Sequence, residues 1–202
     1  MSDNEQSYWK FYPAFINPEL ATHLYHEMNQ LCQRYPTSNW DKTKTFVSKR
    51  RSAVFIKDQG KTRTTSSPFF SYGQLPGYNT SQAPVLMHIW KYIEEQIEET
   101  FTYALVHIYQ TGEDTLGYHN DKEALNPPTS VFSISLGATR LFRLRSITET
   151  RGWAAQYEMT SGSALHMLPG CQAHYKHSVP VQKKVKDWRI NVTFRQNPLT
   201  DS

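Results

Sequence analysis

Two short stretches of the sequence carry residues that could bind a metal ion: "GYHND" at 117–121 and "YKHSVP" at 175–180. His119 and Asp121 are two positions apart, and residues at that spacing in a strand point to the same face. His177 follows 56 residues after Asp121, which is enough chain for a later strand to bring it opposite. Two imidazoles and one carboxylate leave coordination positions open, as is typical of non-haem Fe(II) centres and also suits catalytic zinc.

A third stretch, "RINVTFR" at 189–195, carries cations and an amide along one predicted strand. Arg189, Asn191 and Arg195 are all at odd positions, so strand alternation places them on one face. Guanidinium groups inside a β-core need anions, because an unpaired buried charge is costly.

The anion that these arginines need is not supplied by the neighbouring predicted strands, since residues 131–145 contain no acid. A small dicarboxylate such as 2-oxoglutarate fits, because arginine holds a carboxylate through two parallel hydrogen bonds. Its keto-acid end would also chelate Fe(II), so this ligand favours iron over zinc. Tyr109 and His107, on one face of "VHIYQ", could donate to the same ligand.

A structural role for the same residues is the alternative reading. His-x-Asp pairs are common by chance, and His174 lies three residues before His177 in a chain with eight histidines. The order and spacing of the whole set favour a metal centre. Alternation predicts Tyr175 and His177 on one face of a strand and His174 on the other, so His177 is the expected ligand.

Two segments before residue 104 have the apolar spacing of helices. In 17–35, Asn17 can cap the helix and Pro18 suits its first turn. Its apolar face consists of Leu20, Leu24, Met28 and Leu31. The second segment, 83–101, has an apolar stripe of Leu86, Ile89, Trp90, Ile93, Ile97 and Phe101.

The remaining chain is rich in short β-type segments separated by turn residues. They are "ALVHIYQ", "VFSISLG", "TRLFRLRS", "GWAAQYEM", "SALHMLP", "HYKHSVP" and "DWRINVTFRQ", with "SAVFIKD" as a further strand before the second helix. Seven or eight short strands at this spacing indicate a closed double sheet, a barrel or jelly roll. No second-domain linker is visible, so we expect one domain.

Composition and charge indicate the compartment and the kind of partner to expect for such a domain. The length of 202 residues suits one core, no apolar run reaches a membrane span, and "MSDNEQSYWKF" is not a signal peptide. We therefore expect an intracellular protein without a disulfide framework, since it has two cysteines. Residues 42–63 carry eight Lys or Arg and one acid, so this segment is +7 in a chain of net charge +4. It is either a solvated basic loop or a contact surface for phosphates.

The sequence resembles the AlkB family of Fe(II)- and 2-oxoglutarate-dependent dioxygenases. The matching stretches are "HIYQTGEDTLGYHNDKE", "SVFSISLGATRLFRLRS", "HYKHSVP" and "RINVTFRQ". The resemblance implies a mainly β fold with flanking helices, in one domain over 1–202. A double-stranded β-helix (jelly-roll) core would occupy 104–196. Residues 1–103 would hold the helices and a nucleotide-recognition lid at about 40–80.

The resemblance also implies roles for individual residues. His119, Asp121 and His177 would bind Fe(II). Residues assigned to 2-oxoglutarate are Arg189 with Tyr109 at the distal carboxylate, Arg195 and Asn191 at the other end, and His107, which stands where the family usually has Asn. Residues assigned to the substrate are Glu123, Arg145, Phe55, Tyr72, Lys49, Arg50 and Arg51, with Phe69 and Phe70 as further lid candidates.

The implied activity is oxidative demethylation of N-methylated bases in DNA or RNA with O₂, by a monomer that has no membrane partner. Release of formaldehyde, succinate and CO₂ would accompany it. Two alternatives stay open: a dioxygenase acting on a protein or a small molecule, and a non-catalytic binding module whose histidines are structural.

Overall fold

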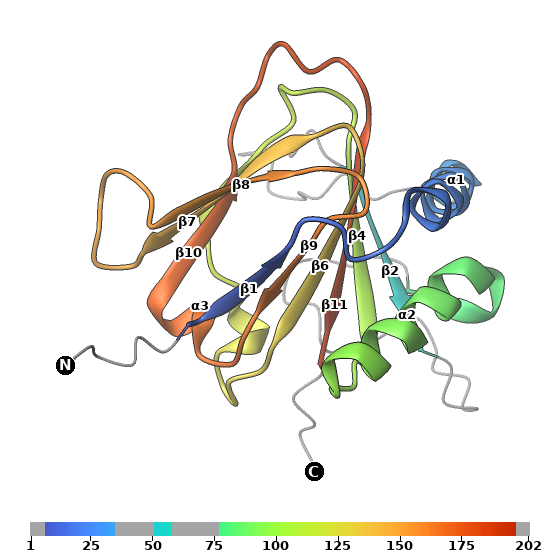
Figure 1. Ribbon diagram of the computed structural model, residues 1–202, viewed down its shortest axis with the longest axis horizontal. Coiled ribbons are helices and arrows are strands. Elements are labelled where there is room, and N and C mark those ends of the chain that lie inside the picture. The colour runs from blue at the N-terminus through green and yellow to red at the C-terminus, as the bar shows by residue number, and fades with distance from the viewer. Residues whose placement is uncertain (1–6, 35–50, 58–76, 197–202) are drawn as a thin grey trace.

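The computed structural model describes residues 7–34, 51–57 and 77–196 (Figure 1). Most of the predicted lid at 40–80 lies outside these residues. Two sheets face one another, with two long helices on the outer side of the larger sheet.

The larger sheet has seven strands in the order β1, β9, β6, β11, β4, β2, β3. Their bounds are β1 Trp9–Tyr12, β9 Ala164–Met167, β6 Val131–Gly137, β11 Arg189–Arg195, β4 Tyr103–Tyr109, β2 Arg51–Ile56 and β3 Gly77–Asn79. All neighbours are antiparallel except β2 and β3, which run parallel.

The smaller sheet has four antiparallel strands in the order β5, β10, β7, β8. Their bounds are β5 Leu116–His119, β10 Tyr175–Val179, β7 Arg140–Ser146 and β8 Ala155–Met159. From β4 to β11 the chain crosses between the sheets at every step except from β7 to β8, so the prediction of a jelly-roll core is confirmed. The placement of all 202 residues in one domain stays a prediction.

The two long helices, α1 (Pro18–Arg34) and α2 (Pro84–Ile97), begin as the sequence predicts. The Asn17 side chain accepts the Leu20 amide at 2.8 Å, which caps α1. The start of α2 is capped from α1, because the Glu27 carboxylate accepts the amides of Val85 at 2.9 Å and Leu86 at 2.8 Å. That contact fixes the start of one helix against the side of the other.

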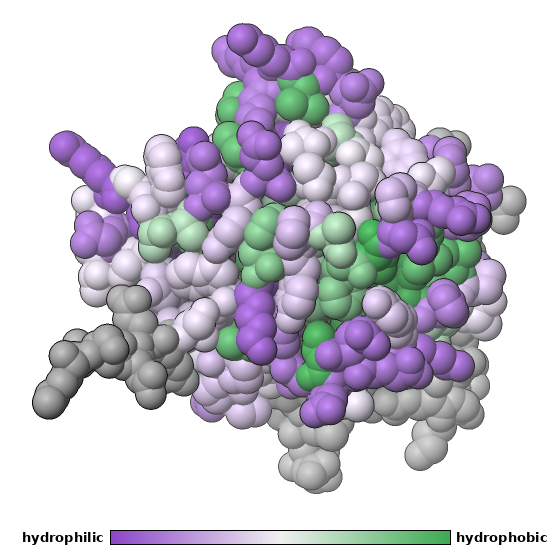
Figure 2. All heavy atoms as spheres, viewed as in Figure 1, coloured by the Kyte–Doolittle hydropathy of each residue, from purple (hydrophilic) through white to green (hydrophobic). Residues whose placement is uncertain are grey.

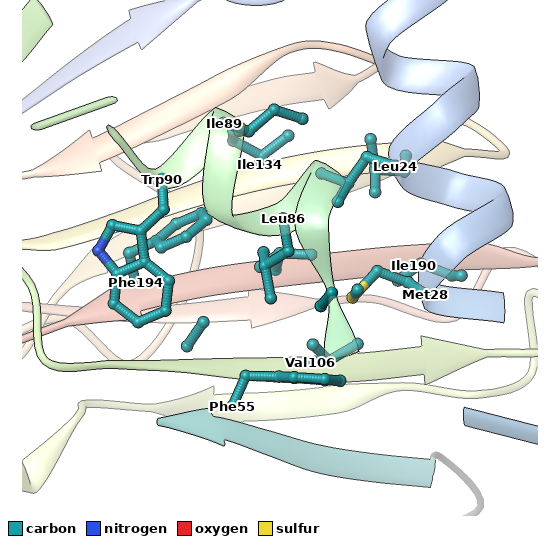
Figure 3. Packing of buried hydrophobic residues seen from close by; sticks show 14 of the residues in the cluster. Leu24, Met28, Phe55, Leu86, Ile89, Trp90, Val106, Ile134, Ile190 and Phe194 are labelled. Carbon is teal, nitrogen blue, oxygen red and sulfur yellow. The ribbon is translucent and has the colours of Figure 1, made fainter. Parts of the chain in front are cut away.

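The main hydrophobic core lies between these helices and the larger sheet (Figure 3). Ile190, Val192 and Phe194 of β11 face the helices and are fully buried. Leu86 and Trp90 of α2 pack against that face, and Trp90 meets the Phe194 ring edge-on at 5.2 Å between centroids. Figure 2 shows that hydrophobic side chains reach the surface mainly beside α1 and α2, on a face that is otherwise largely polar.

Three elements differ from the sequence-based expectation. The second helix, predicted over 83–101, ends at Ile97, so Phe101 lies beyond it. The edge strand β1 was not predicted, and it pairs with β9 from Trp9 to Tyr12. The strand predicted from His174 begins one residue later, because Cys171–His174 forms a single helical turn, α3. None of the helices in the described part of the chain is long and apolar enough to cross a membrane.

Candidate metal centre and cosubstrate site

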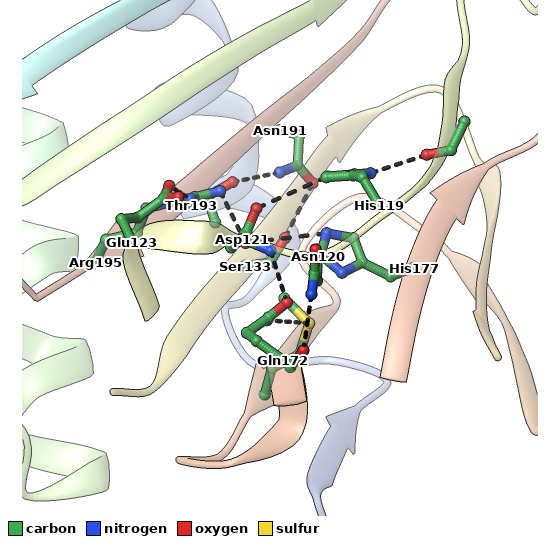
Figure 4. Close-up of polar contacts among 12 residues, drawn as sticks. His119, Asn120, Asp121, Glu123, Ser133, Gln172, His177, Asn191, Thr193 and Arg195 are labelled. Carbon is green, nitrogen blue, oxygen red and sulfur yellow. Dashed lines mark hydrogen bonds and ion pairs between the residues drawn. The ribbon is translucent and has the colours of Figure 1, made fainter. Parts of the chain in front are cut away.

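The three predicted metal ligands meet between the two sheets. His119 ends β5, and it is directly paired with His177 of β10. Asp121 follows at the start of a short 3₁₀ turn, η2 (Lys122–Ala124). The side chains of His119, Asp121 and His177 point toward one another, and their ligand atoms all lie within 4.8 Å of each other (Figure 4).

The ligand atoms are close enough to share one ion. The distances from the Asp121 carboxylate are 3.7 Å to Nε2 of His119 and 3.9 Å to Nε2 of His177. His119 is oriented by its Nδ1, which lies 2.8 Å from the Gly117 carbonyl and leaves Nε2 for a metal. His174 belongs to α3 instead, where its ring lies 4.8 Å from that of Tyr8.

The surroundings of Asp121 and His177 shift the pKa values of both side chains in the direction that favours metal binding. Burial raises the pKa of Asp121, but Arg195 and the two imidazoles outweigh it and hold the pKa below its usual range. Burial and the nearby His119 lower the pKa of His177 to about 4, against the attraction of Asp121. The carboxylate is therefore ionised and the imidazole neutral at neutral pH, which are the forms that bind a metal.

Arg195 ties the metal ligands to the last strand. Its Nη2 lies 3.0 Å from the Asp121 carboxylate, and its Nη1 is hydrogen-bonded to Glu123. Glu123 was predicted to contact the substrate base. Its carboxylate is occupied by Arg195 in this structure, and a contact with the base stays a prediction.

Arg189 lies at the other end of the same strand face and is almost fully buried. It donates to the Ser135 hydroxyl at 2.8 Å and to the side-chain oxygen Oδ1 of Asn191 at 2.6 Å, and its guanidinium lies 5.1 Å from the Tyr109 ring. Its Nη1 is buried without a hydrogen-bond partner among the described residues. Burial lowers the pKa of Arg189 to about 10, with Tyr109 opposing the shift, so the group is still a cation at neutral pH.

A buried cation with an unused donor fits a carboxylate ligand. No acidic side chain among the described residues is ion-paired with Arg189. The residues present therefore fit the distal carboxylate of 2-oxoglutarate, and the assignment of Arg189 to that carboxylate stays a prediction.

Polar residues of the central strands complete the inner face. Asn191 accepts from Ser133 at 3.1 Å and donates to Thr193 at 2.9 Å. His107 is paired with Asn191 in the sheet, and its Nδ1 lies 2.7 Å from the Ser52 hydroxyl of β2. The serines were not singled out from the sequence. Ser133 and Ser135 are at odd positions of "VFSISLG" and pair with odd positions of β11, and this spacing could have placed them on the same face.

Arg140 is a third buried arginine, and nothing in the sequence indicated its role. It donates to the carbonyl oxygens of Thr111 at 3.0 Å, Asp114 at 2.8 Å and Pro180 at 2.9 Å. Its guanidinium also lies 5.6 Å from the Tyr109 ring, on which Arg189 packs as well. Because backbone acceptors fill its donors, Arg140 has a structural role.

Phe55 was predicted to contact the substrate, and the structure contradicts this prediction. Phe55 is fully buried in the helix-side core, paired with Ala104 of β4, and cannot stack on a base (Figure 3). Alternation puts Ser52 and Val54 on the metal side of β2 instead. The backbone of Arg51 pairs with Ile108. Lys49, Arg50, Phe69, Phe70 and Tyr72 lie outside the described residues.

Arg145 is on the smaller sheet but on its outer face. Its neighbour Leu144 is paired with His177 and points inward, so Arg145 points outward. Its guanidinium lies 3.7 Å from the ring centre of Tyr118, and it donates to the Thr150 carbonyl at 2.9 Å. A substrate contact by Arg145 stays a prediction, and it would have to be made outside the metal pocket.

The comparisons with known proteins agree with this site. The profile of the family described as "2OG-Fe(II) oxygenase superfamily" matches residues 9–195. The match takes in nearly the whole chain, so the protein belongs to this superfamily of iron- and 2-oxoglutarate-dependent oxygenases.

Its relatives within the superfamily are AlkB proteins. Mouse "DNA oxidative demethylase ALKBH2" is 35% identical over 121 residues, which cover 56% of this chain and 50% of that protein. Human "Alpha-ketoglutarate-dependent dioxygenase alkB homolog 3" is 29% identical over 193 residues, covering 91% and 64%. The solved structure of OsALKBH1 matches with a TM-score of 0.59 at 17% identity, covering 95% of this chain and 98% of that one. The chain is thus an AlkB-family member that spans about half the length of the ALKBH2 relatives.

Proposed function

We propose that this protein is an Fe(II)- and 2-oxoglutarate-dependent oxidative demethylase of N-methylated bases in DNA or RNA. The observation that carries the proposal is a set of polar side chains that the two sheets direct toward each other. At one end are His119, Asp121 and His177, and at the other is Arg189 with an unused donor. A dicarboxylate between them would reach the metal with one end and Arg189 with the other.

Each residue of this set has a defined task. His119, Asp121 and His177 would hold Fe(II), and Arg195 fixes the Asp121 carboxylate. When bound, iron and 2-oxoglutarate supply the oxidation of a substrate C–H bond by O₂, with succinate and CO₂ as by-products. On an N-methyl group, the hydroxylated product releases formaldehyde and the unmodified base.

The nucleic-acid substrate rests on two observations. Relatives that match this chain are named as DNA oxidative demethylases. The chain also carries its positive charge in a block, since residues 42–63 are +7 while the whole chain is +4. A basic segment of this kind suits phosphates, because neutralised phosphates release counterions. Monomeric state and intracellular location remain predictions.

The direct test is a panel of oligonucleotides, single- and double-stranded DNA and RNA, each with one N-methylated base. Purified protein with Fe(II), 2-oxoglutarate and air should lower the mass of at least one member by one methylene and release formaldehyde. A His177→Ala variant is the control for metal-dependent turnover. Succinate formation without turnover of any oligonucleotide, together with turnover of a methylated peptide or small molecule, would move the protein to the alternative substrate class.

The basic segment has its own test. Replacing Lys49, Arg50 and Arg51 together by Ser should lower the slope of log affinity against log salt by up to roughly 2–3 units. The control is Lys91→Ser, an exposed lysine of α2, the helix that packs on the side of the larger sheet away from the metal ligands. An unchanged slope in the triple variant would mean that the segment is only a solvated basic loop, even in an active demethylase.

A further inference from the structure

Gln172 lies under the metal ligands although it is not one of them. It belongs to the single turn α3 (Cys171–His174), which leads directly into β10 and its ligand His177. The side chain is almost fully buried, with 1% of its surface exposed. A buried amide needs partners for its donor and its acceptor.

Gln172 finds those partners on the segment that carries the other two ligands (Figure 4). Its side-chain Oε1 accepts the backbone amide of Asp121 at 2.9 Å, and its backbone carbonyl accepts the Asn120 side-chain amide at 3.1 Å. Its own Nε2 points to the sulfur of Met167 at 3.4 Å. Two hydrogen bonds therefore clamp the 119–121 segment to the turn before β10.

The clamp matters because strand pairing alone holds the ligands weakly. β5 and β10 are paired at His119 and His177, but the register shifts between His177 and Val179. Asp121 lies beyond the end of β5, where no ladder bond of that strand reaches it. Its backbone amide is instead fixed by Gln172, so the origin of the carboxylate side chain is fixed relative to β10.

We propose that Gln172 is a positioning residue of the metal centre, which sets the distance of Asp121 from His177 before any ion binds. The inference rests on the proposed iron site and deepens it. Removing Oε1 would leave the buried Asp121 amide without its acceptor, and the segment would shift to find another. Partners that orient metal ligands typically contribute about 10- to 100-fold in metal affinity.

The test is titration of metal-free protein with Co(II), without 2-oxoglutarate or nucleic acid. Gln172→Leu and the unbranched Gln172→Met both remove the acceptor, and both should weaken Co(II) binding by about 10-fold or more. Their Co(II) absorption spectra should also differ from that of the wild type, because the ligand geometry changes. Asn120→Ala removes only the second bond of the clamp and should have a smaller effect in the same direction.

The matched control is Gln182→Leu. Gln182 also accepts a backbone amide, that of Leu141 at 2.7 Å, together with Arg140 at 3.2 Å, but it lies away from the metal ligands. This variant should lower the free energy of unfolding and leave the Co(II) affinity and spectrum unchanged. An equal loss of affinity in Gln182→Leu would make the effect one of general stability and overturn the inference.

Other outcomes separate this inference from the proposed function. If the wild type and His177→Ala bind Co(II) equally well, the metal site itself is wrong. If wild-type binding depends on His177 while Gln172→Leu and Gln172→Met keep wild-type affinity and spectrum, only the clamp is wrong. Failure of both Gln172 variants to fold would also overturn it, because Gln172 would then support the fold instead of the ligand geometry.

Discussion

The two faces of β11 differ in chemistry although both are buried. Toward the helices, Ile190, Val192 and Phe194 are part of a continuous hydrophobic core. Toward the smaller sheet, Arg189 and Arg195 line the proposed cosubstrate site. The even positions of this strand therefore contribute mainly to stability, and the odd positions carry the polar side chains that are proposed to bind ligands. The comparison teaches that one strand can serve both purposes because its side chains alternate.

The largest effect should come from a metal ligand on the polar side. We expect His119→Ala to abolish turnover, since two ligands remain for an ion that needs three. The free energy of unfolding of the metal-free protein should change by less than about 1 kcal/mol, because this partly exposed side chain is not in a hydrophobic cluster. Activity and urea unfolding of the same preparation check both statements. Retained turnover would refute the ligand assignment.

The matching change on the apolar face is Phe194→Ala. It removes a fully buried ring that meets Trp90 edge-on, so the free energy of unfolding should fall by about 3–5 kcal/mol. In the fraction that stays folded, 2-oxoglutarate affinity should be close to that of the wild type. Chemical denaturation and calorimetric binding at low temperature measure the two quantities. A loss of affinity without a loss of stability would contradict the division between the faces.

Arg189→Lys tests the polar face of β11, and its expected effect is smaller than that of the two changes above. Lysine keeps the charge but loses the planar fork, so KM for 2-oxoglutarate should rise about 10- to 100-fold, or about 1.4–2.8 kcal/mol. Nucleic-acid affinity should change little. Arg140→Lys is the comparison variant. It should lower the free energy of unfolding and have a smaller effect on KM than Arg189→Lys has, because the partners of Arg140 are loop carbonyls.

A polar contact on the helix side, between Glu27 and the start of α2, tests whether changes on this side alter only stability. Glu27→Ala removes the acceptor for two amides at the start of α2, and the free energy of unfolding should fall by about 1–2 kcal/mol. Glu19→Ala, an exposed acid in the first turn of α1, is the control. KM for 2-oxoglutarate should stay the same in both variants. A raised KM in Glu27→Ala would show that the helices act on the site.

The smallest effect concerns Glu99, a partly buried acid on the helix side. Burial raises its pKa, but hydrogen bonds with His166 and Ser130 and the charges of His166 and Lys10 outweigh this and lower it below the usual value. A lowered folded-state pKa means that its contribution is present above the unfolded pKa and is lost as pH falls through the folded pKa. Glu99→Gln should therefore flatten the acid limb of a plot of stability against pH. An unchanged limb would place the acid sensitivity elsewhere.

The strands and the site could be predicted where alternation is regular. In β11 apolar and polar residues alternate without a break, so the faces of Arg189, Asn191 and Arg195 followed directly from their positions. The metal ligands were found because their residue types are restricted and their order along the chain is specific. Arg189 and Arg195 were assigned to the cosubstrate because the neighbouring strands offer them no acidic partner. In the structure Arg195 is paired with Asp121 and Glu123 from outside those strands, and both assignments stay predictions.

Three features could not be predicted, each for a physical reason. In "SAVFI" both faces are apolar, so alternation could not show that Phe55 belongs to the core. The turn α3 is too short to have a helical period, and His174 therefore read as part of a strand. Arg140 could not be told from Arg189 in the sequence, because its partners are backbone carbonyls of distant loops.

The contacts of Arg140 close one end of the roll. The loop after β4 and the loop before β11 lie side by side in Figure 1, and they are joined by hydrogen bonds of 2.8 Å from Gly112 to Val185 and from Gln182 to Gly112. A side chain at Gly112 would meet the Gln182 carbonyl oxygen at 1.8 Å, so the approach needs glycine. Arg189 lies just inside this closed end.

A closed end has a kinetic consequence. A ligand whose distal carboxylate binds Arg189 should enter and leave at the metal end, which is also where a substrate would arrive. The cosubstrate should therefore load first, and a bound nucleic acid should slow its escape. The succinate product should in turn leave only after the repaired strand has gone. The closed end of the β-roll would thus set the order in which the cosubstrate and the nucleic acid bind and leave, even without direct contact between them.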